Sequence, residues 1–92
     1  MDHPINLRLA NIYISSSHNR TVITAATKCV CFYCKKTTEP KDILEYCDNG
    51  NTAICPHCGV DSILPNSAFP NNIIDDNIVT QMQELYFTNG VV

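Results

Sequence analysis

Apolar residues alternate with other residues at the start of the chain, from Ile5 to Leu9 and again from Ile12 to Ile14. A repeat of two residues sends successive side chains to opposite faces of a β-strand. The pattern therefore predicts an apolar N-terminal strand segment over residues 1–14, with one or two short strands between residues 5 and 14.

A helix is predicted after the three serines that end this alternation. Serine is a favourable N-cap because its hydroxyl accepts a hydrogen bond from a free amide of the first helical turn. With Ser17 as the cap, we expect a short helix from about His18 to Thr27. Its apolar face would consist of Val22, Ile23 and Ala26.

The strongest turn signal lies at Asp48–Asn51, where an Asn-Gly pair favours two successive residues with positive φ. Apolar residues follow this turn, and we expect strands at residues 52–54 and 59–64, on either side of a pair of cysteines. Upstream, a threonine cap favours a single helical turn over residues 40–46.

The end of the chain has the spacing of an amphipathic helix. Its apolar positions are Ile78, Met82, Leu85 and Tyr86. Asp75 is a suitable N-cap and begins an acidic first turn, which favours the positive end of the helix dipole. We predict a helix over residues 76–87, within a C-terminal segment 75–88, after a loop of prolines and asparagines at 65–74.

Length and composition place the chain among small globular domains. It has 92 residues, of which 45% are hydrophobic. A chain this short buries only about 60% of its unfolded surface, so a metal or another cross-link commonly supports the fold. The sequence contains no apolar run long enough for a membrane span and begins without a secretory signal pattern, so we expect a cytoplasmic protein with reduced cysteines.

Two Cys-x-x-Cys hooks occupy the centre of the sequence, with twenty residues between Cys34 and Cys55. Two such hooks complete a tetrahedron of thiolates with Zn–S bonds of about 2.3 Å. A closed tetrathiolate site has no position for substrate, so the ion would be structural. We predict one Zn²⁺ held by Cys31, Cys34, Cys55 and Cys58.

The predicted fold is a small α+β zinc ribbon forming one domain over residues 1–92. Two Cys-x-x-Cys knuckles on a β-hairpin form the ribbon core at residues 15–64, with a short N-terminal helix and a C-terminal amphipathic helix beside them. Iron is a chemical alternative because tetrathiolate sites also accept it, but the first hook lacks the glycine that follows such hooks in rubredoxins. Cys29 is expected to be a small buried residue, Cys47 a free thiol, and His57 a side chain that points away from the metal.

Charge is distributed unevenly along the chain. Residues 1–38 contain five basic residues and one acidic residue, whereas residues 39–92 contain one basic residue and eight acidic residues, which gives a net charge of −3. Lys28, Lys35 and Lys36 flank the first hook, where they can offset the negative thiolates or remain solvated. Nucleic-acid binding calls for a denser basic face, so we treat it as an alternative function.

One polar stretch beside the predicted short helix suggests a ligand site. Free amides at a helix start, serine hydroxyls and an arginine can converge on an anion, and two residues after the second hook can add hydrogen bonds. The candidate ligand-binding residues are Ser17, His18, Asn19, Arg20, Asp61 and Ser62. The structural alternative is that serine caps the helix and Arg20 pairs with Asp61 or Glu45.

Two segments resemble a family of small bacterial zinc-ribbon proteins that are usually described only as "cytoplasmic protein". The likeness is carried by Cys29–Cys34, which reads CVCFYC, and by Thr52–Ile63, which reads TAICPHCGVDSI. The chain departs from the family at Val30, where glycine is usual, and at Tyr46, where tryptophan is usual. The resemblance implies a zinc ribbon of about residues 15–88 and a cytoplasmic location but no particular activity.

These observations favour a non-enzymatic, zinc-stabilised binding module. It would bind a protein partner or a small phosphate-containing, nucleotide-like ligand, as an adaptor or as an inhibitor or sequestering protein of the kind that bacteria and phages use. Nucleic-acid binding through the ribbon is the alternative, and a small hydrolase with His18 as general base is a further one. The apolar segment 5–14 also suits a symmetric homodimer.

Overall fold

The structure is a computed structural model that describes residues 4–88. Three α-helices are present: α1 (Pro4–Ile14), α2 (Arg20–Ala25) and α3 (Asp76–Gln83), the last continued by the π-helical turn η4 (Glu84–Thr88). The strands are β1 (Cys29–Cys31), β2 (Thr37–Thr38), β3 (Tyr46–Cys47), β4 (Thr52–Ala53) and β5 (Ile63–Pro65). Single 3₁₀ turns are η1 (Pro40–Asp42), η2 (Asn66–Ala68) and η3 (Pro70–Asn72).

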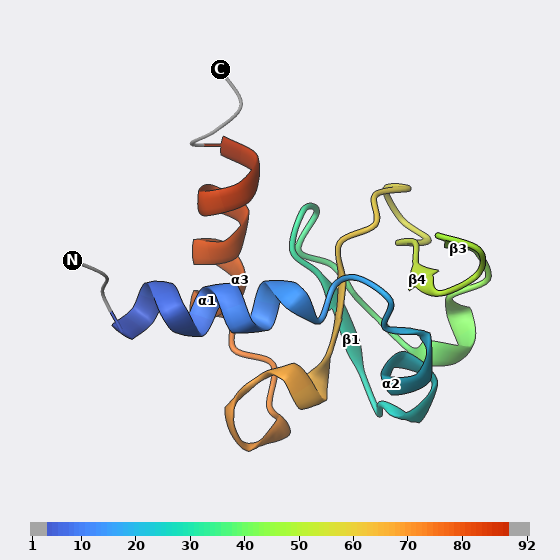
Figure 1. Cartoon of the computed structure of the whole chain (residues 1–92), viewed down its shortest axis with the longest axis horizontal. Coiled ribbons are helices and arrows are strands. Elements are labelled where there is room, and N and C mark those ends of the chain that lie inside the picture. The colour runs from blue at the N-terminus through green and yellow to red at the C-terminus, as the bar shows by residue number, and fades with distance from the viewer. Residues whose placement is uncertain (1–3, 89–92) are drawn as a thin grey trace.

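The strands form two small antiparallel sheets, and β1 is the central strand of the larger one. The order in that sheet is β2-β1-β5, with Val30 opposite both Thr37 and Leu64. The second sheet pairs β3 with β4. In Figure 1, α1 and α3 lie on one side of β1, and α2 lies with the β3–β4 hairpin on the other side.

Two hydrophobic cores lie on opposite faces of the larger sheet, because strand side chains alternate between faces. Val30 and Phe32 belong to the core formed with α1 and α3, whereas Cys29 and Cys31 belong to the core formed with α2 and the β3–β4 hairpin. The helical core contains Leu9, Ile12, Val30, Phe32, Leu64, Phe69, Ile78, Val79 and Met82. The cysteine core contains Ile23, Cys29, Cys31, Ile43, Ala53, Cys55 and Ile63.

The strand segment predicted for residues 1–14 is wrong, because residues 4–14 form helix α1. Residues 1–3 lie outside the described part of the chain. The N-terminal alternation coincides with a second, helical repeat, in which Leu9 and Ile12 are three residues apart and both are buried. Pro4, at the first helical position, also favours a helix start, since its φ is preset and its missing amide hydrogen is not needed there.

The short helix predicted at 18–27 is present but begins and ends within that range, at Arg20 and Ala25. The expectation that Ser17 caps it is wrong. His18 has a φ of 49°, which is outside the helical region, so the helix cannot begin there. Asn19 occupies the N-cap position, although its side chain makes no capping hydrogen bond.

Asn19 instead joins three separate segments of the fold. Its side-chain amide donates to the carbonyl oxygens of Ser15 at 2.8 Å and Ile63 at 2.9 Å, and its Oδ1 accepts from the backbone amide of Ala53 at 3.0 Å. The side chain is buried. Asn19 therefore connects the end of the α1 region, strand β4 and strand β5 through one satisfied polar group.

The predicted turn at residues 48–51 is confirmed. Asp48, Asn49 and Gly50 all have positive φ, and the amide of Asn51 donates to the carbonyl oxygen of Cys47 at 2.9 Å. The strand expected at 52–54 is present as β4. The strand expected at 59–64 is shorter and later, since β5 covers only residues 63–65.

The predicted C-terminal helix is confirmed in its position and its cap. Asp75 Oδ1 accepts hydrogen bonds from the amides of Asn77 and Ile78, and α3 with η4 extends to residue 88. Gly90, a residue type that often ends helices, lies outside the described residues. Tyr86 of η4 stacks on Tyr13 of α1, with ring centroids 4.0 Å apart. This stacking joins the two helical segments that cover the larger sheet.

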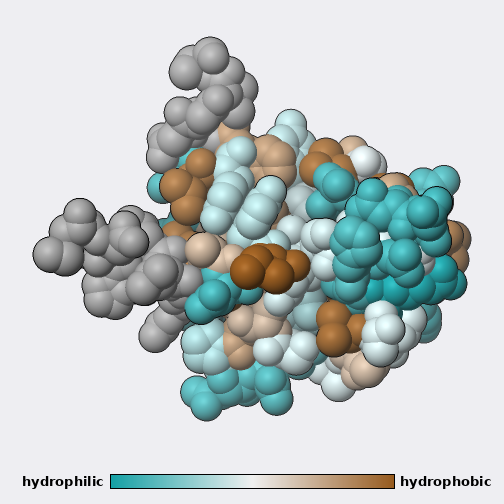
Figure 2. All heavy atoms as spheres, viewed as in Figure 1, coloured by the Kyte–Doolittle hydropathy of each residue, from teal (hydrophilic) through white to brown (hydrophobic). Residues whose placement is uncertain are grey.

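Figure 2 shows hydrophilic residues gathered over the β3–β4 hairpin. The large apolar side chains exposed in the described part of the chain lie on several elements, from Tyr13 and Ile14 in α1 to Leu44 before β3. None of the helices in the described part of the chain has the length and apolar character that a bilayer crossing requires.

Replacing Asn19 with alanine should destabilise the folded state by about 2–4 kcal/mol, because buried backbone groups of β4 and β5 would lose their partner. Urea unfolding followed by circular dichroism measures this change. Thr21→Ala, on the exposed side of the same helix, is the matched control and should change stability by no more than about 0.5 kcal/mol. Equal stability of the two variants would contradict the structural role of Asn19.

Candidate metal centre

The four cysteines of the two hooks lie together on the cysteine-core side of the larger sheet. Cys31 is the last residue of β1, so the strand places its side chain beside Cys29 in that core. Cys55 lies two residues after β4, and its amide donates to the carbonyl oxygen of Val60 at 3.0 Å. Each hook thus follows a strand whose position is fixed by backbone pairing.

The two hooks have the same backbone design. Lys35 donates from its amide to the carbonyl oxygen of Cys31 at 2.8 Å, and Gly59 donates in the same way to Cys55 at 2.9 Å. Both residues have positive φ, 66° for Lys35 and 79° for Gly59. Glycine adopts this conformation without steric cost, whereas lysine does not. The first hook therefore forms the same turn without the glycine that the second hook has.

Backbone amides point at the first sulfur of each hook. Cys31 Sγ lies 3.4 Å from the amide nitrogen of Tyr33 and 3.5 Å from that of Cys34. Cys55 Sγ lies 3.3 Å from the amide nitrogen of His57. Such N–H···S bonds stabilise thiolate, which is the form that binds metal.

The side-chain sulfurs of Cys31, Cys34, Cys55 and Cys58 all lie within 4.8 Å of one another. The sulfurs of Cys31 and Cys58 are 3.6 Å apart, and those of Cys34 and Cys55 are 3.8 Å apart. A tetrahedron with Zn–S bonds of about 2.3 Å has edges of about 3.8 Å, so the sulfurs have the spacing of a tetrathiolate metal site. All six cysteines of the chain are free thiols.

Burial makes the cluster unfavourable for thiolates unless a cation is present. Burial raises the pKa of Cys31 to about 12, although the Ser62 hydroxyl and the amides of Cys34 and Tyr33 lower it. Burial also acts to raise the pKa of Cys55, but the amides of His57 and Cys58 outweigh it, and the pKa is lowered. A bound divalent ion would supply the charge that the buried Cys31 thiol needs in order to ionise.

Ser62 provides one contact to the cluster from outside the hooks. Its Oγ lies 3.1 Å from Cys31 Sγ, and the side chain is buried. When Cys31 is a metal-bound thiolate, the serine hydroxyl is the donor. Ser62 is therefore placed to orient this ligand and to reduce its charge, as outer-shell groups do in metal sites.

The two other cysteines lie outside the group. Cys29 is fully buried in the cysteine core, and burial raises the pKa of its thiol to about 11. Cys47 is half-buried in β3. His57 is exposed, and its contact with the cluster is through its backbone amide. His57, like Cys29 and Cys47, is therefore not a member of the group of four converging side chains.

The residues predicted to bind an anion do not converge on one point. Arg20 stacks over the ring of Tyr46, with its guanidinium carbon 4.5 Å from the ring centroid, and donates to the carbonyl oxygen of Gly50 at 2.9 Å. It forms no ion pair with Asp61 or Glu45 among the described residues. Asn19 is occupied by the three hydrogen bonds given above. Neither side chain is directed at a shared ligand position.

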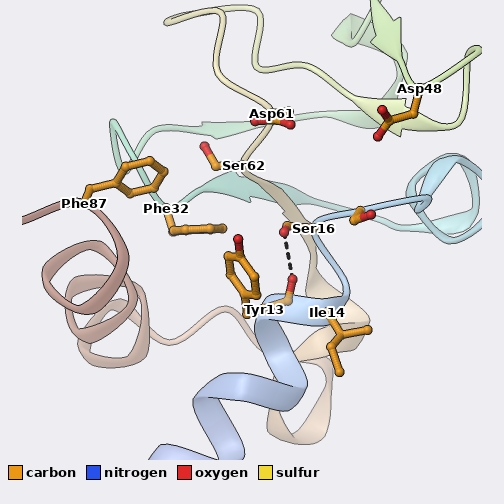
Figure 3. A pocket seen from close by; sticks show the side chains of 9 residues that line it. Tyr13, Ile14, Ser16, Phe32, Asp48, Asp61, Ser62 and Phe87 are labelled. Carbon is orange, nitrogen blue, oxygen red and sulfur yellow. Dashed lines mark hydrogen bonds between the residues drawn. The ribbon is translucent and has the colours of Figure 1, made fainter. Parts of the chain in front are cut away.

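Three other members of the predicted set, Ser17, Asp61 and Ser62, line a pocket (Figure 3). His18 is exposed, and its Nδ1 is 2.9 Å from Ser17 Oγ. The set predicted from the sequence lacks the aromatic residues of this pocket, because two of them, Tyr13 and Phe87, belong to α1 and η4. The 3.6-residue spacing of Leu9, Ile12 and Tyr13 in α1 could have pointed to Tyr13.

Comparison with known proteins assigns no family: no protein-family model matches the chain, and no curated protein or solved structure is significantly similar to it. The resemblance to small bacterial zinc-ribbon proteins therefore stays a prediction. The case for a metal site comes from the geometry of the four sulfurs.

Replacing Cys31 with serine should weaken zinc binding at least about 100-fold, because one of four thiolates is lost. Competition with a chromogenic chelator measures the affinity, and elemental analysis after gel filtration measures the metal content. Cys47→Ser is the control, since it removes a thiol outside the group and should leave the metal content unchanged. An equal loss of bound zinc in the Cys31 and Cys47 variants would contradict the assignment of the ligands.

Replacing Ser62 with alanine should weaken zinc binding about tenfold while all four thiolates remain. The reason is the loss of the hydroxyl that donates to Cys31 Sγ. The same chelator competition measures it, with Ser67→Ala, at an exposed position in η2, as the control. Identical affinities would show that Ser62 is only a packing residue.

Proposed function

We propose that this chain is a non-enzymatic binding module built as a zinc ribbon, in which one structural Zn²⁺ is held by Cys31, Cys34, Cys55 and Cys58. The observation that carries the proposal is the mutual proximity of four sulfurs, all within 4.8 Å, on two hooks of the same backbone design. Four thiolates satisfy a tetrahedral ion, so no position is left for catalysis at the metal.

Zinc is favoured over iron by the structural character of the site. Zinc has no redox chemistry and is the usual ion of closed four-cysteine sites. Iron can bind the same four thiolates. Visible absorbance distinguishes the two metals, since an iron tetrathiolate absorbs visible light whereas the zinc form is colourless. A cytoplasmic location suits either ion because the ligands must stay reduced.

The metal would organise the binding surface as well as the core. The residue after Cys31 is Phe32, and its amide donates to the carbonyl oxygen of Ser62 at 3.0 Å. Both residues line the pocket in Figure 3. A module of this kind would bind its ligand or protein partner beside the metal centre without using the metal for chemistry.

The alternative functions receive less support from the positions of their residues. Hydrolysis with His18 as general base would require a second titratable group nearby, but the His18 ring contacts the Ser17 hydroxyl instead. Phosphate or nucleic-acid binding would use Arg20, which is held against Tyr46 and Gly50. We therefore base the binding function on the pocket beside the metal centre.

Removing zinc from the purified full chain with a strong chelator should unfold it, because structural zinc contributes roughly 10–16 kcal/mol of binding free energy in small zinc domains. Dispersion of amide resonances in an NMR spectrum measures the folded state, and elemental analysis should give one zinc per chain. Zinc should restore the spectrum, whereas Mg²⁺, which prefers oxygen ligands, should not. A metal-free chain that keeps its folded spectrum would contradict the proposal.

A further inference from the structure

A pocket of about 520 Å³ lies between the end of α1, the first cysteine hook, the residues before β5, the β3–β4 turn and η4. Its lining residues are Tyr13, Ile14, Ser16, Ser17, Phe32, Asp48, Asp61, Ser62 and Phe87. A volume of this size is within the range of small-molecule sites, which is about 300–1,000 Å³. The pocket brings together segments from the whole length of the described chain.

One side of the pocket is aromatic. Phe32 lies against Tyr13 with ring centroids 6.0 Å apart and against Phe87 with centroids 5.3 Å apart. In Figure 3 these three rings are grouped together. Phe32 is buried and fixed by the main-chain bond to Ser62, so this wall has a rigid centre.

The other side of the pocket is polar and negatively charged. Asp48 Oδ2 accepts a hydrogen bond from the hydroxyl of Thr52 at 2.8 Å, which holds the carboxylate in place. No hydrogen bond or ion pair within residues 4–88 engages the carboxylate of Asp61. The lining contains no lysine or arginine, and Figure 3 shows Asp48 at the end of the pocket away from Phe87, with Asp61 between them, above Ser62.

We propose that this pocket binds an organic cation that has an apolar portion, with its ammonium or guanidinium group beside Asp48 and Asp61 and its hydrocarbon portion against the aromatic wall. The charge of the cation complements the two carboxylates, and the aromatic wall adds apolar contacts to its hydrocarbon portion. Anionic ligands would meet two negative groups without a compensating cation.

Two sources can supply this chemistry: a free amine, or the lysine or arginine side chain of a partner protein. The pocket recognises the same feature in both, namely a positive group next to an apolar one. This inference rests on the proposed zinc-stabilised module, because Phe32 and Ser62 are positioned by the hook that contains Cys31. Ser62 is a lining residue and also contacts Cys31 Sγ at 3.1 Å.

The test uses the zinc-loaded full chain and NMR titration with three probes of similar shape. 2-Phenylethylamine is cationic, 2-phenylethanol is neutral and 3-phenylpropionate is anionic. We expect the amine to shift the amide resonances of the pocket with a dissociation constant of about 1 mM or less, and the alcohol and the acid to bind at least about fivefold more weakly. A blocked Phe-Arg dipeptide, titrated in parallel, represents a partner's side chain.

Asp61→Asn should weaken amine binding about fivefold, since it removes one negative charge without changing the shape of the side chain. Asp76→Asn, which makes the same charge change on α3 outside the pocket, is the control and should have little effect. Asp61 is exposed, so the variant should keep its fold, and an unchanged melting temperature checks this. Stronger binding of the dipeptide than of the amine would assign the ligand to a partner protein, and the reverse would assign it to a small molecule.

The proposal is overturned if the folded, zinc-loaded protein binds neither the amine nor the dipeptide at about 10 mM, a concentration at which even millimolar affinity is visible. It is also overturned if the neutral alcohol binds as well as the amine, or if the two asparagine variants behave alike. A chain that contains no metal, or that stays folded without it, contradicts the proposed module instead. The two failures are therefore distinguishable.

Discussion

The constraint on which the rest of the structure depends is the convergence of four sulfur atoms from two distant hooks. Cys31 and Cys58 are brought within 3.6 Å although 27 positions separate them in the sequence. Two strands of three residues and three strands of two residues supply little backbone pairing of their own. So few hydrogen bonds hold the β3–β4 hairpin only weakly. A metal ion shared by both hooks would connect this hairpin to the larger sheet.

Strand β1 shows how much a short segment can organise when both of its faces are used. Cys29 and Cys31 point to the cysteine core, and Val30 and Phe32 point to the helical core. The strand and the residue after it therefore place a candidate metal ligand on one side and a pocket wall on the other. A displacement of Cys31 would also move Phe32, because the two residues are adjacent in the chain.

The clustering of the four cysteines could be predicted from the sequence because its signal is local. The spacing within each hook and the turn at Asp48–Asn51 depend on a few adjacent residues. The N-terminal helix was not predicted, because its apolar residues fit the repeat of a strand as well as that of a helix, and packing against α3 favours the helix. Asn19 was expected at a ligand site, yet its three partners are Ser15, Ala53 and Ile63, which no local pattern identifies. Tertiary contacts decided the positions that local propensity left open.

The placement of Arg20 changes what the polar residues near the metal centre can recognise. An arginine in the pocket would make it a site for anions, but here the guanidinium lies over Tyr46 and bonds to Gly50, in the turn that follows Asp48. The arginine thus supports the turn that holds one carboxylate of the pocket, and leaves Asp61 without an ion pair in the described part of the chain. Electrostatic selectivity depends on which charges face the ligand and not on the net charge of the region. Three of the residues that suggest a phosphate site in the sequence, Ser17, Asp61 and Ser62, therefore line the pocket that we propose for a cation.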